Sequence, residues 1–413
     1  MPVGEQRFGI ERLGVWPATM VLDIETLCAE RGSDYATVAR SLNTFQRSVC
    51  PPWEDTVTMA VNAASGLLTE EELGTVELLI AVTESSVDQE KPVSSWVHRW
   101  LGLQSHCRNF EIKHACYAGT AALRMAMAWL REQEGRPVRA LIVGADLSLL
   151  GFREPYEPVM GACGFALVVS NTPDFLEIER ARYGIYANEV TDVIRPALTV
   201  ETGNSETSLL AYLDALEGAY RDFVRRTGER CDFARDFSRH VYHLPFAGMG
   251  LRAHRALAAL ALEMDRKSAT AHFDATVEPS IRYSRRIGSS YSASTFIALL
   301  SLLDHDAGAG PETPLSVFSY GSGSCAELYA ARLGPRSREI AAATALGARL
   351  DARRPLDVAE YERSETARVG AIGAADFVPD ADLIPGWFDD AYAGRGLLVL
   401  DRIDDYERLY RRT

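Results

Sequence analysis

The sequence is poor in several features that mark particular classes of protein. Lysine and arginine, 43 in total, are outnumbered by 57 acidic residues, which leaves a net charge of -14. This balance argues against a nucleic-acid-binding protein, because such proteins normally carry a basic surface. The seven cysteines include no Cys-x-x-Cys pair, so neither a structural zinc site nor a disulfide framework is expected.

Long apolar segments are also missing. The most apolar stretch, residues 296–303, is far too short to cross a bilayer. The opening residues, Met1-Pro-Val-Gly-Glu-Gln-Arg7, lack the apolar core of a secretion signal. With 47% hydrophobic and 24% charged residues, the composition is typical of a soluble globular protein, and we expect it in the reducing cytoplasm, away from membranes.

Apolar runs of strand and helix type alternate along the chain, which is the pattern of an α/β protein. Strands are predicted at 76–82, 138–145, 164–170, 315–320 and 392–402, and helices at 115–131, 252–266 and 294–304. A charged helix or turn is predicted at 402–412, and surface loops at 351–355 and 376–385. No low-complexity linker divides the 413 residues.

Cys116 is the most informative single residue. An apolar approach from Phe110 ends at this cysteine, and a segment rich in alanine and glycine follows. The thiol is therefore predicted at a helix N-terminus, where free N–H groups and the helix dipole favour the thiolate and lower the thiol pKa. Such a cysteine is a usable nucleophile near neutrality. The alternative is a buried structural cysteine.

Two more residues stand at the ends of predicted elements. Glu84 falls where a strand gives way to a loop, and His243 precedes a helix. Each has an ordinary interpretation, as a solvated loop carboxylate and as a hydrogen-bonded core histidine. Together with Cys116, they suggest acyl-thioester chemistry, although spacing alone does not show that they meet.

The run Gly321-Ser-Gly-Ser-Cys-Ala326 follows a predicted strand. It superficially matches a dinucleotide-binding fingerprint, but no clear βαβ unit with a ribose-binding acid follows it. We interpret it as a glycine-rich turn that brings backbone N–H groups close to a reacting carbonyl, because such donors form oxyanion holes.

Several of these segments, in this order, resemble the 3-hydroxy-3-methylglutaryl synthase family of condensing enzymes. The matching stretches are Arg47-Ser-Val49, Glu54-Asp-Thr-Val-Thr-Met-Ala-Val-Asn-Ala-Ala64, Thr83-Glu-Ser-Ser-Val-Asp88, Glu111-Ile-Lys-His-Ala-Cys-Tyr117, Gly144-Ala-Asp146, Tyr242-His-Leu-Pro-Phe246 and Phe318-Ser-Tyr-Gly-Ser-Gly323. A match at many points along almost the whole chain is far more specific than any single motif.

The resemblance implies the duplicated five-layered αβαβα fold of thiolases, in a homodimer. Residues 1–172 would form an N-terminal half with Glu84 and Cys116, and residues 173–413 a C-terminal half with His243 and the loop Gly321–Gly323. Both halves would belong to one catalytic unit.

By the same resemblance, Glu84, Cys116 and His243 are the catalytic residues. Cys116 would carry an acetyl group as a thioester, and Glu84 would remove a proton from its methyl group. Backbone N–H groups at Cys116 and near Ser322 would hold the enolate oxygen, while His243 would orient the ketone of a second acyl thioester. No metal and no bound cofactor are expected, since the substrates are thioesters of phosphopantetheine on a carrier protein or of coenzyme A.

Four residues are expected to bind substrate: Ser289, Tyr320, Gly321 and Ser322. The family usually has Gly-Asn where this chain has Gly288-Ser289. That asparagine amide helps to hold the thioester carbonyl, and a serine hydroxyl reaches less far. The change leaves room for an altered substrate range.

The family has a branch that starts mevalonate synthesis from coenzyme A thioesters and a branch that installs β-branches on polyketides held by acyl carrier proteins. The segments after His243 and from Glu201 to Leu213 resemble the polyketide branch. An acidic carrier would need a basic patch to dock on, for which the candidates are Arg225, Arg226, Arg230, Arg252 and Arg255. The remaining alternatives are the coenzyme A-dependent synthase, an acyltransferase forming an ester or amide, and a non-catalytic partner of acyl carriers.

Overall fold

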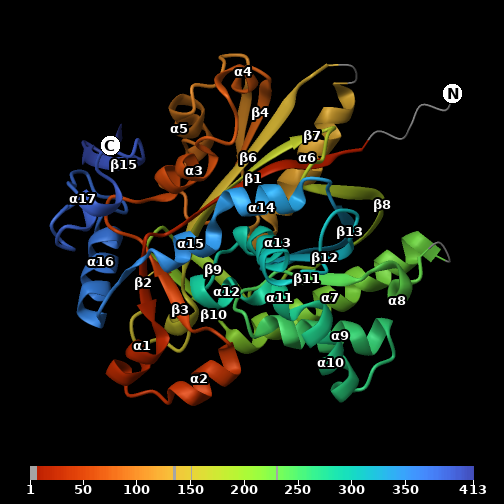
Figure 1. Ribbon diagram of the computed structural model, residues 1–413. Coiled ribbons are helices and arrows are strands. Elements are labelled where there is room, and N and C mark those ends of the chain that lie inside the picture. The colour runs from red at the N-terminus through yellow and green to blue at the C-terminus, as the bar shows by residue number, and fades with distance from the viewer. Residues whose placement is uncertain (1–6, 134–135, 150, 229–230) are drawn as a thin grey trace.

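The computed structural model describes residues 7–133, 136–149, 151–228 and 231–413. Its centre is a nine-stranded sheet in the order β11-β12-β13-β8-β1-β7-β6-β4-β5 (Figure 1). The bounds in that order are Arg239–Tyr242, Pro314–Gly321, Cys325–Leu333, Leu176–Ala187, Gly9–Pro17, Ala162–Ser170, Arg139–Leu147, Val76–Val82 and Arg108–Ile112. The predicted strands at 76–82, 138–145, 164–170 and 315–320 are confirmed within two residues.

Strands from each predicted half of the chain are neighbours in this sheet. β1, β7, β6, β4 and β5 come from residues before 172, and β11, β12, β13 and β8 come from residues after it. The two sets meet where β1 pairs with β8. The internal repeat itself stays a prediction.

Helices separate and cover the two parts of the sheet. α3 (Thr56–Ala64) packs on β1, β6 and β7, and α7 (Ser205–Thr227) packs on β8 and β13. Between the two parts lie α6 (Ala118–Glu132), which contacts β4, β6 and β7, and α13 (Ala293–His305), which contacts β7, β11 and β12. The resulting order of layers is αβαβα.

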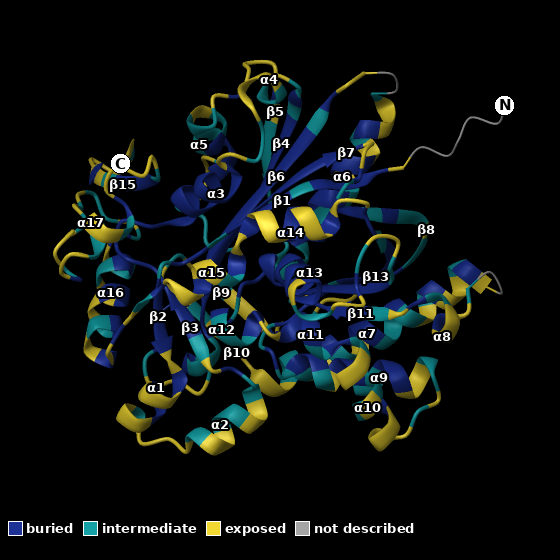
Figure 2. Cartoon of the chain, viewed as in Figure 1, coloured by how far each residue is buried: buried dark blue, intermediate teal, exposed yellow. Residues whose placement is uncertain are grey.

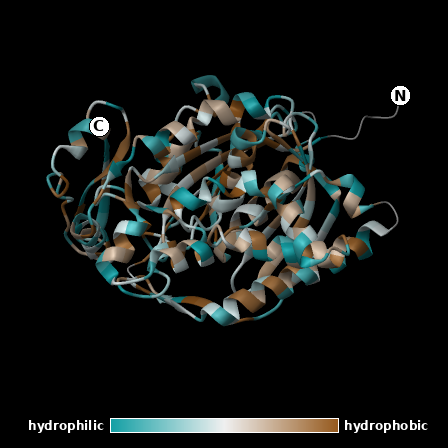
Figure 3. Ribbon diagram, turned by 60° about the horizontal axis from the view of Figure 1, so that its bottom comes forward, coloured by the Kyte–Doolittle hydropathy of each residue, from teal (hydrophilic) through white to brown (hydrophobic). Residues whose placement is uncertain are grey.

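The burial pattern explains this arrangement. Residues 293–303 of α13 are buried all round, as expected for a helix that lies between the two parts of the sheet. Figure 2 shows the same dark blue interior in β1, β6 and β7, whereas α1 (Ile24–Arg31), α2 (Tyr35–Leu42) and α10 (Arg266–Thr276) expose one face. In Figure 3 the outer helices alternate hydrophobic and hydrophilic segments, as amphipathic helices do.

The predicted helix 252–266 is wrong in its extent. The structure has α9 (Met249–Ala261) and then α10, which starts after the N-cap Asp265. Glu263, between them, has a left-handed φ of 51°, and Asp265 accepts a hydrogen bond from the Ser268 N–H. A helix cannot continue through that conformation.

The predicted C-terminal helix or turn is also wrong. β15 (Leu398–Asp404) and β16 (Glu407–Arg412) form an antiparallel hairpin instead. The strand predicted at 392–402 begins only at Leu398, six residues after the predicted start, because Tyr392 caps the end of α17 (Trp387–Ala391). Tyr410 donates to Asp55 Oδ2 at 2.8 Å, so tertiary contacts fix a segment whose charges suggested a helix.

The remaining elements are mostly peripheral. A small sheet consists of β14 (Arg354–Pro355), β2 (Met20–Asp23) and β3 (Gln46–Val49), and a two-stranded ribbon of β9 (Val193–Ala197) and β10 (Val200–Gly203). The other α-helices are α4 (Glu70–Leu73), α5 (Val93–Trp100), α8 (Phe233–Asp236), α11 (Glu278–Ile281), α12 (Ser284–Ile287), α14 (Ser337–Thr344), α15 (Leu346–Asp351) and α16 (Val358–Gly370). β14 lies within the predicted loop 351–355, whereas 376–385 is a loop as predicted.

Among the described residues, no helix has both the length and the apolar character to cross a membrane.

Candidate active site

The ends of several strands and the starts of two helices meet at one place. β4 and β6 are parallel neighbours, with Val82 opposite Gly144, so Glu84 and Asp146 follow at the same edge of the sheet. β11 and β12 are also parallel, and His243 comes directly after β11. α6 and α13 begin beside each other, where Gly119 N–H donates to Ser292 Oγ at 3.3 Å.

Cys116 lies in a tight 3₁₀ turn, η1 (Ala115–Tyr117), which leads directly into α6. The preceding Ala115 has a left-handed φ of 43°, a strained conformation that such sites often hold. Ser292 Oγ donates to the Cys116 carbonyl at 3.1 Å. The predicted position at a helix start is therefore confirmed.

Cys116 and Glu84 are in direct contact. The thiol donates to Glu84 Oε1 at 3.5 Å. Burial, followed by the charge of Glu84, raises the pKa of the Cys116 thiol well above its ordinary value. The predicted lowering of this pKa is thus wrong, because the loss of water and a neighbouring carboxylate outweigh the helix terminus. In its resting state Cys116 is a thiol.

Asp146 and Arg195 fix the turn that carries Glu84. Asp146 Oδ1 accepts hydrogen bonds from the Glu84 N–H at 2.7 Å and from the Thr83 hydroxyl at 3.0 Å. Arg195 donates to the Glu84 carbonyl at 2.8 Å and forms an ion pair with Glu201 at 2.6 Å. Burial, and then the charge of Asp146, raises the pKa of Glu84 above its usual range.

His243 is buried and presents one nitrogen to the site. Its Nδ1 is 2.6 Å from Ser294 Oγ, and Ser294 Oγ also accepts from the Leu244 N–H at 3.2 Å. This arrangement favours the imidazole tautomer that is protonated on Nε2, because the Ser294 hydroxyl can then donate a hydrogen bond to the unprotonated Nδ1. Within the described residues, His243 Nε2 has no hydrogen-bond partner. Burial lowers the pKa of His243 to about 3, so the ring is neutral at pH 7.

Tyr320 and Gly321 connect the two halves of the site. The Tyr320 ring lies 6.4 Å from that of His243, and its hydroxyl donates to Asp192 Oδ2 at 3.0 Å. A Cβ atom on Gly321 would lie 2.6 Å from the Tyr117 nitrogen and 2.8 Å from the His114 carbonyl oxygen. Only glycine lets β12 come this close to the cysteine turn.

The glycine-rich loop and the cysteine turn both offer free donors. Among the described residues, the N–H groups of Cys116 and Ser322 donate no hydrogen bond to the protein. Asp192 holds this loop by accepting from the Gly323 N–H at 3.0 Å. Ser289 is half-buried between α12 and α13, and its N–H donates to the Val159 carbonyl at 2.7 Å.

The arginines proposed for docking lie on different helices. Arg225 and Arg226, near the end of α7, both pair with Asp222. Arg252 and Arg255 lie on α9. Arg252 is exposed above the Phe246 ring, and Arg255 donates to Thr270. Arg230 lies outside the described residues.

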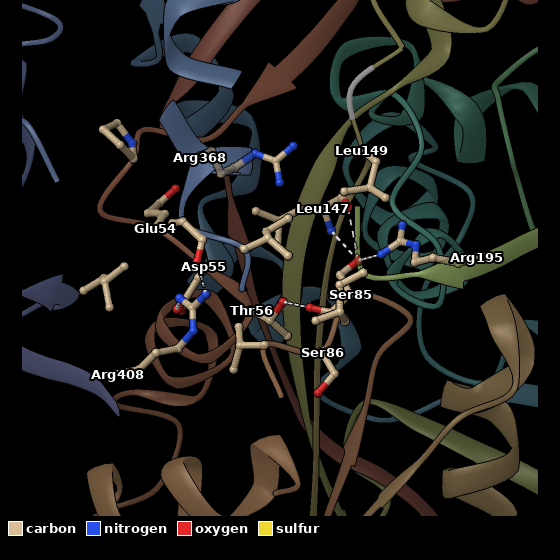
Figure 4. A pocket seen from close by; sticks show the side chains of 16 residues that line it. Glu54, Asp55, Thr56, Ser85, Ser86, Leu147, Leu149, Arg195, Arg368 and Arg408 are labelled. Atoms are coloured by element: carbon tan, nitrogen blue, oxygen red, sulfur yellow. Dashed lines mark hydrogen bonds and ion pairs between the residues drawn. The ribbon is translucent and has the colours of Figure 1, made fainter. Parts of the chain in front are cut away.

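Figure 4 shows a narrow pocket beside Ser85, the residue that follows Glu84. Glu54, Thr56 and Arg195 also line it. Thr56 Oγ1 donates to the Ser85 carbonyl at 2.5 Å, which ties the start of α3 to this turn. With a cavity volume of about 40 Å³, the pocket has room for water but not for an acyl chain.

Sequence reasoning missed the residues that support Glu84, Cys116 and His243, the residues predicted to be catalytic. Only Asp146 could have been found from the sequence, because a polar residue directly after a predicted strand is a candidate for a site at the edge of the sheet. Arg195, Glu201 and Ser294 are distant in sequence from the groups they position, and no local pattern pointed to them. Tyr291, with a left-handed φ of 47°, donates to Glu201 at 3.1 Å and belongs to the same set.

Known proteins similar to this chain come from both branches of one family. Residues 251–413 match the model for the hydroxymethylglutaryl-coenzyme A synthase C-terminal domain. The chain is 32% identical over 417 residues to the polyketide biosynthesis 3-hydroxy-3-methylglutaryl-ACP synthase PksG of Bacillus subtilis (strain 168), covering 98% of each chain. It is 31% identical over 360 residues to the hydroxymethylglutaryl-CoA synthase of Enterococcus faecalis, covering 86% of this chain and 90% of that one.

A solved structure agrees with the sequence comparison. The curacin biosynthetic pathway HMG synthase, crystallised in complex with holo donor-ACP, superposes with a TM-score of 0.94 at 34% identity. The superposition covers 99% of this chain and all of that one. The layer order described above is therefore the thiolase-like fold of these synthases. The chain belongs to the 3-hydroxy-3-methylglutaryl synthase family.

Proposed function

We propose that this enzyme adds an acetyl-derived enolate, held as a thioester on Cys116, to the β-ketone of a chain carried by an acyl carrier protein. The product is a 3-hydroxy-3-methylglutaryl-type β-branch. The observation that carries the proposal is the contact between the Cys116 thiol and the Glu84 carboxylate, 3.5 Å apart in a half-buried site. This contact places a base beside any acyl group on the sulfur.

In the first step, Cys116 attacks the donor thioester, and the thiol proton ends on the departing phosphopantetheine sulfur. Glu84 then removes a proton from the acetyl methyl group. Its raised pKa makes it a stronger base than an ordinary carboxylate. The N–H groups of Cys116 and Ser322 are the donors for the enolate oxygen, because neither has a partner among the described residues.

In the second step, the enolate carbon bonds to the ketone carbon of the acceptor. His243 Nε2–H donates to the ketone oxygen, which gains negative charge as the bond forms. A neutral histidine suits this task, since its proton is shared without being lost. The proton that Glu84 took from the methyl group then goes to the alkoxide oxygen, which gives the 3-hydroxyl group and restores the Glu84 carboxylate. Water then hydrolyses the Cys116 thioester, which frees the thiol and leaves the new carboxylate on the carrier-bound product.

Carrier-bound substrates are favoured by two observations. Two relatives that match nearly the whole chain, at 32% and 34% identity, are the 3-hydroxy-3-methylglutaryl-ACP synthase PksG and the curacin enzyme solved with a donor-ACP. After His243, the chain has Gly248, Leu251 and Arg252, whereas enzymes of the mevalonate type tend to carry lysines there that suit the phosphates of coenzyme A. The proposal includes a homodimer, for which the edge strand β5 is available, since no strand in the described part of the chain pairs with its outer side. It also places the reaction in the cytoplasm, where free thiols such as these seven are common.

The donor experiment tests the carrier dependence. We expect acetyl-carrier protein to acetylate the enzyme faster than acetyl-CoA at matched concentration, because contacts with the carrier protein itself add to the binding of the shared phosphopantetheine. The measurement is the rate at which the intact chain gains one acetyl mass. Equal or faster loading from acetyl-CoA, with turnover of acetoacetyl-CoA, would assign the enzyme to the mevalonate branch.

Replacing Gly321 by alanine should disturb the cysteine turn. The added methyl group would meet backbone atoms of His114 and Tyr117, and forced overpacking of this kind costs about 1–3 kcal/mol. We expect a lower melting temperature and slower acetylation of Cys116. Gly370→Ala is the matched control, since its methyl group would meet no atom within 4 Å. If Gly321→Ala and the control acetylate equally fast, the close approach of β12 is unimportant.

A further inference from the structure

A second cavity lies apart from the Cys116 site, between the end of β1, helix α15 and the region of α17. Its volume is about 400 Å³, which is within the usual range for small-molecule sites. Its distinctive lining consists of two tryptophans and three arginines: Trp16, Trp387, Arg349, Arg353 and Arg395. None of these residues takes part in the proposed condensation.

The charge of this cavity is opposite to that of the whole chain. Its lining contains no aspartate or glutamate, although the protein carries a net charge of -14. Among the described residues, the Arg395 guanidinium donates only to a neutral group, the Asp390 carbonyl, at 2.6 Å. Arg349 lies 5.4 Å from the centre of the Trp16 ring, and its guanidinium has no hydrogen-bond or ion-pair partner in the described part of the chain.

Arg353 adds a buried positive charge at the back of the cavity. It donates to Ser48 Oγ, Gln46 Oε1 and the Leu350 and Arg286 carbonyls. All four acceptors are neutral, and no described carboxylate lies within ion-pair distance of it. The side chain is held firmly by these bonds, and its charge remains uncompensated. A bound anion would be stabilised here.

The two indoles are held in place by their N–H groups. Trp16 Nε1 donates to Glu54 Oε1 at 2.6 Å, and Trp387 Nε1 donates to Thr19 Oγ1 at 3.3 Å. Both rings are half-buried. Fixed aromatic walls lose little conformational freedom when a flat ligand stacks on them.

We propose that this cavity binds a planar aromatic phosphate of nucleotide size, a nucleoside phosphate. The base stacks on the indoles of Trp16 and Trp387. The phosphate lies on Arg349 and Arg395, whose guanidinium groups form paired, charge-assisted hydrogen bonds with phosphate oxygens. The buried Arg353 adds to the positive electrostatic potential that the phosphate experiences in the cavity.

The test is calorimetric titration of the full-length enzyme with AMP, alongside adenosine and inorganic phosphate. We expect one AMP site per chain. Adenosine and phosphate each lack half of the interactions and should bind at least about tenfold more weakly. Absence of AMP binding at millimolar concentration would overturn the proposal, and so would adenosine binding as tightly as AMP.

Variants locate the site. The double variant Arg349→Gln/Arg395→Gln should weaken AMP binding by about tenfold or more, and Trp387→Leu should weaken AMP and adenosine alike. Arg336→Gln is the control, because Arg336 is equally exposed but pairs with Glu339 on α14. Thermal unfolding of each variant checks that the fold is kept. Unchanged AMP affinity in the folded double variant would place the nucleotide elsewhere and overturn the assignment.

Discussion

Replacing Cys116 by alanine is expected to abolish transfer of an acetyl group onto the enzyme. The thiol is the proposed nucleophile of the first step, and it is held in a turn that β12 and Ser292 fix from two sides. An alanine keeps the turn but has no atom that can form a thioester. Intact-protein mass spectrometry after incubation with acetyl-carrier protein should show no added acetyl mass.

The control for this variant is another cysteine near the same turn. Cys325 begins β13, is half-buried and lies opposite Gly321 in the β12–β13 pair. Cys325→Ala should acetylate at the wild-type rate. If Cys116→Ala still acetylates at an unchanged rate, Cys116 is not the acyl carrier and the proposed first step is wrong.

Replacing Glu84 by glutamine is expected to separate the two steps. Glutamine cannot take the methyl proton, and loss of a general base typically costs about 10²- to 10⁴-fold in rate. Acetylation should survive, because the charge of Glu84 is one of the causes that raise the pKa of the Cys116 thiol. Removing that charge makes the reactive thiolate easier to form.

The measurement follows both products by mass, the acetyl group on the enzyme and the branched chain on the carrier. Glu90→Gln is the matched control, since Glu90 is exposed on the same loop. It should load and condense like the wild type. A Glu84→Gln enzyme that condenses at a near wild-type rate would disprove the proton-abstraction role.

The same carboxylate sets the expected pH dependence. Burial, followed by the charge of Asp146, raises the pKa of Glu84 above its usual value of 4.5. Only the ionised form is a base, so the condensation rate of the acetylated enzyme should rise with pH through this raised pKa. His243 adds no second ionisation to the profile of condensation rate against pH near neutrality, because it gains a proton only near its lowered pKa of about 3.

The stability of the folded enzyme should fall as pH rises through the pKa of Glu84, whereas the condensation rate rises. A carboxyl group whose pKa is higher in the folded state than in the unfolded state destabilises the fold as pH rises from the unfolded pKa through the folded pKa. Glu84→Gln removes this penalty. We therefore expect the variant to melt at the same or a higher temperature than the wild type at pH 8, although it is inactive in condensation.

The sequence by itself determined the fold class and four of the nine strands of the central sheet, and it singled out Glu84, Cys116 and His243 as candidate site residues. β4 and β12 and the start of α6 could be predicted because buried strands and Ala-rich helices have strong local patterns. The ordered series of motifs around Glu84, Cys116 and His243 identified the family. The C-terminal hairpin could not be predicted, because its charged residues are held by distant partners such as Asp55.

Only the tertiary structure decided the protonation of the site. From the sequence, Cys116 has a helix terminus that favours a thiolate. Folding adds burial and brings Glu84 to 3.5 Å, and these raise the thiol pKa. Likewise, Ser294 orients His243 from 51 residues away, and Arg195 holds the Glu84 turn from a distant ribbon. A local pattern contains neither the dielectric around a group nor its long-range partners, and those are what set its pKa.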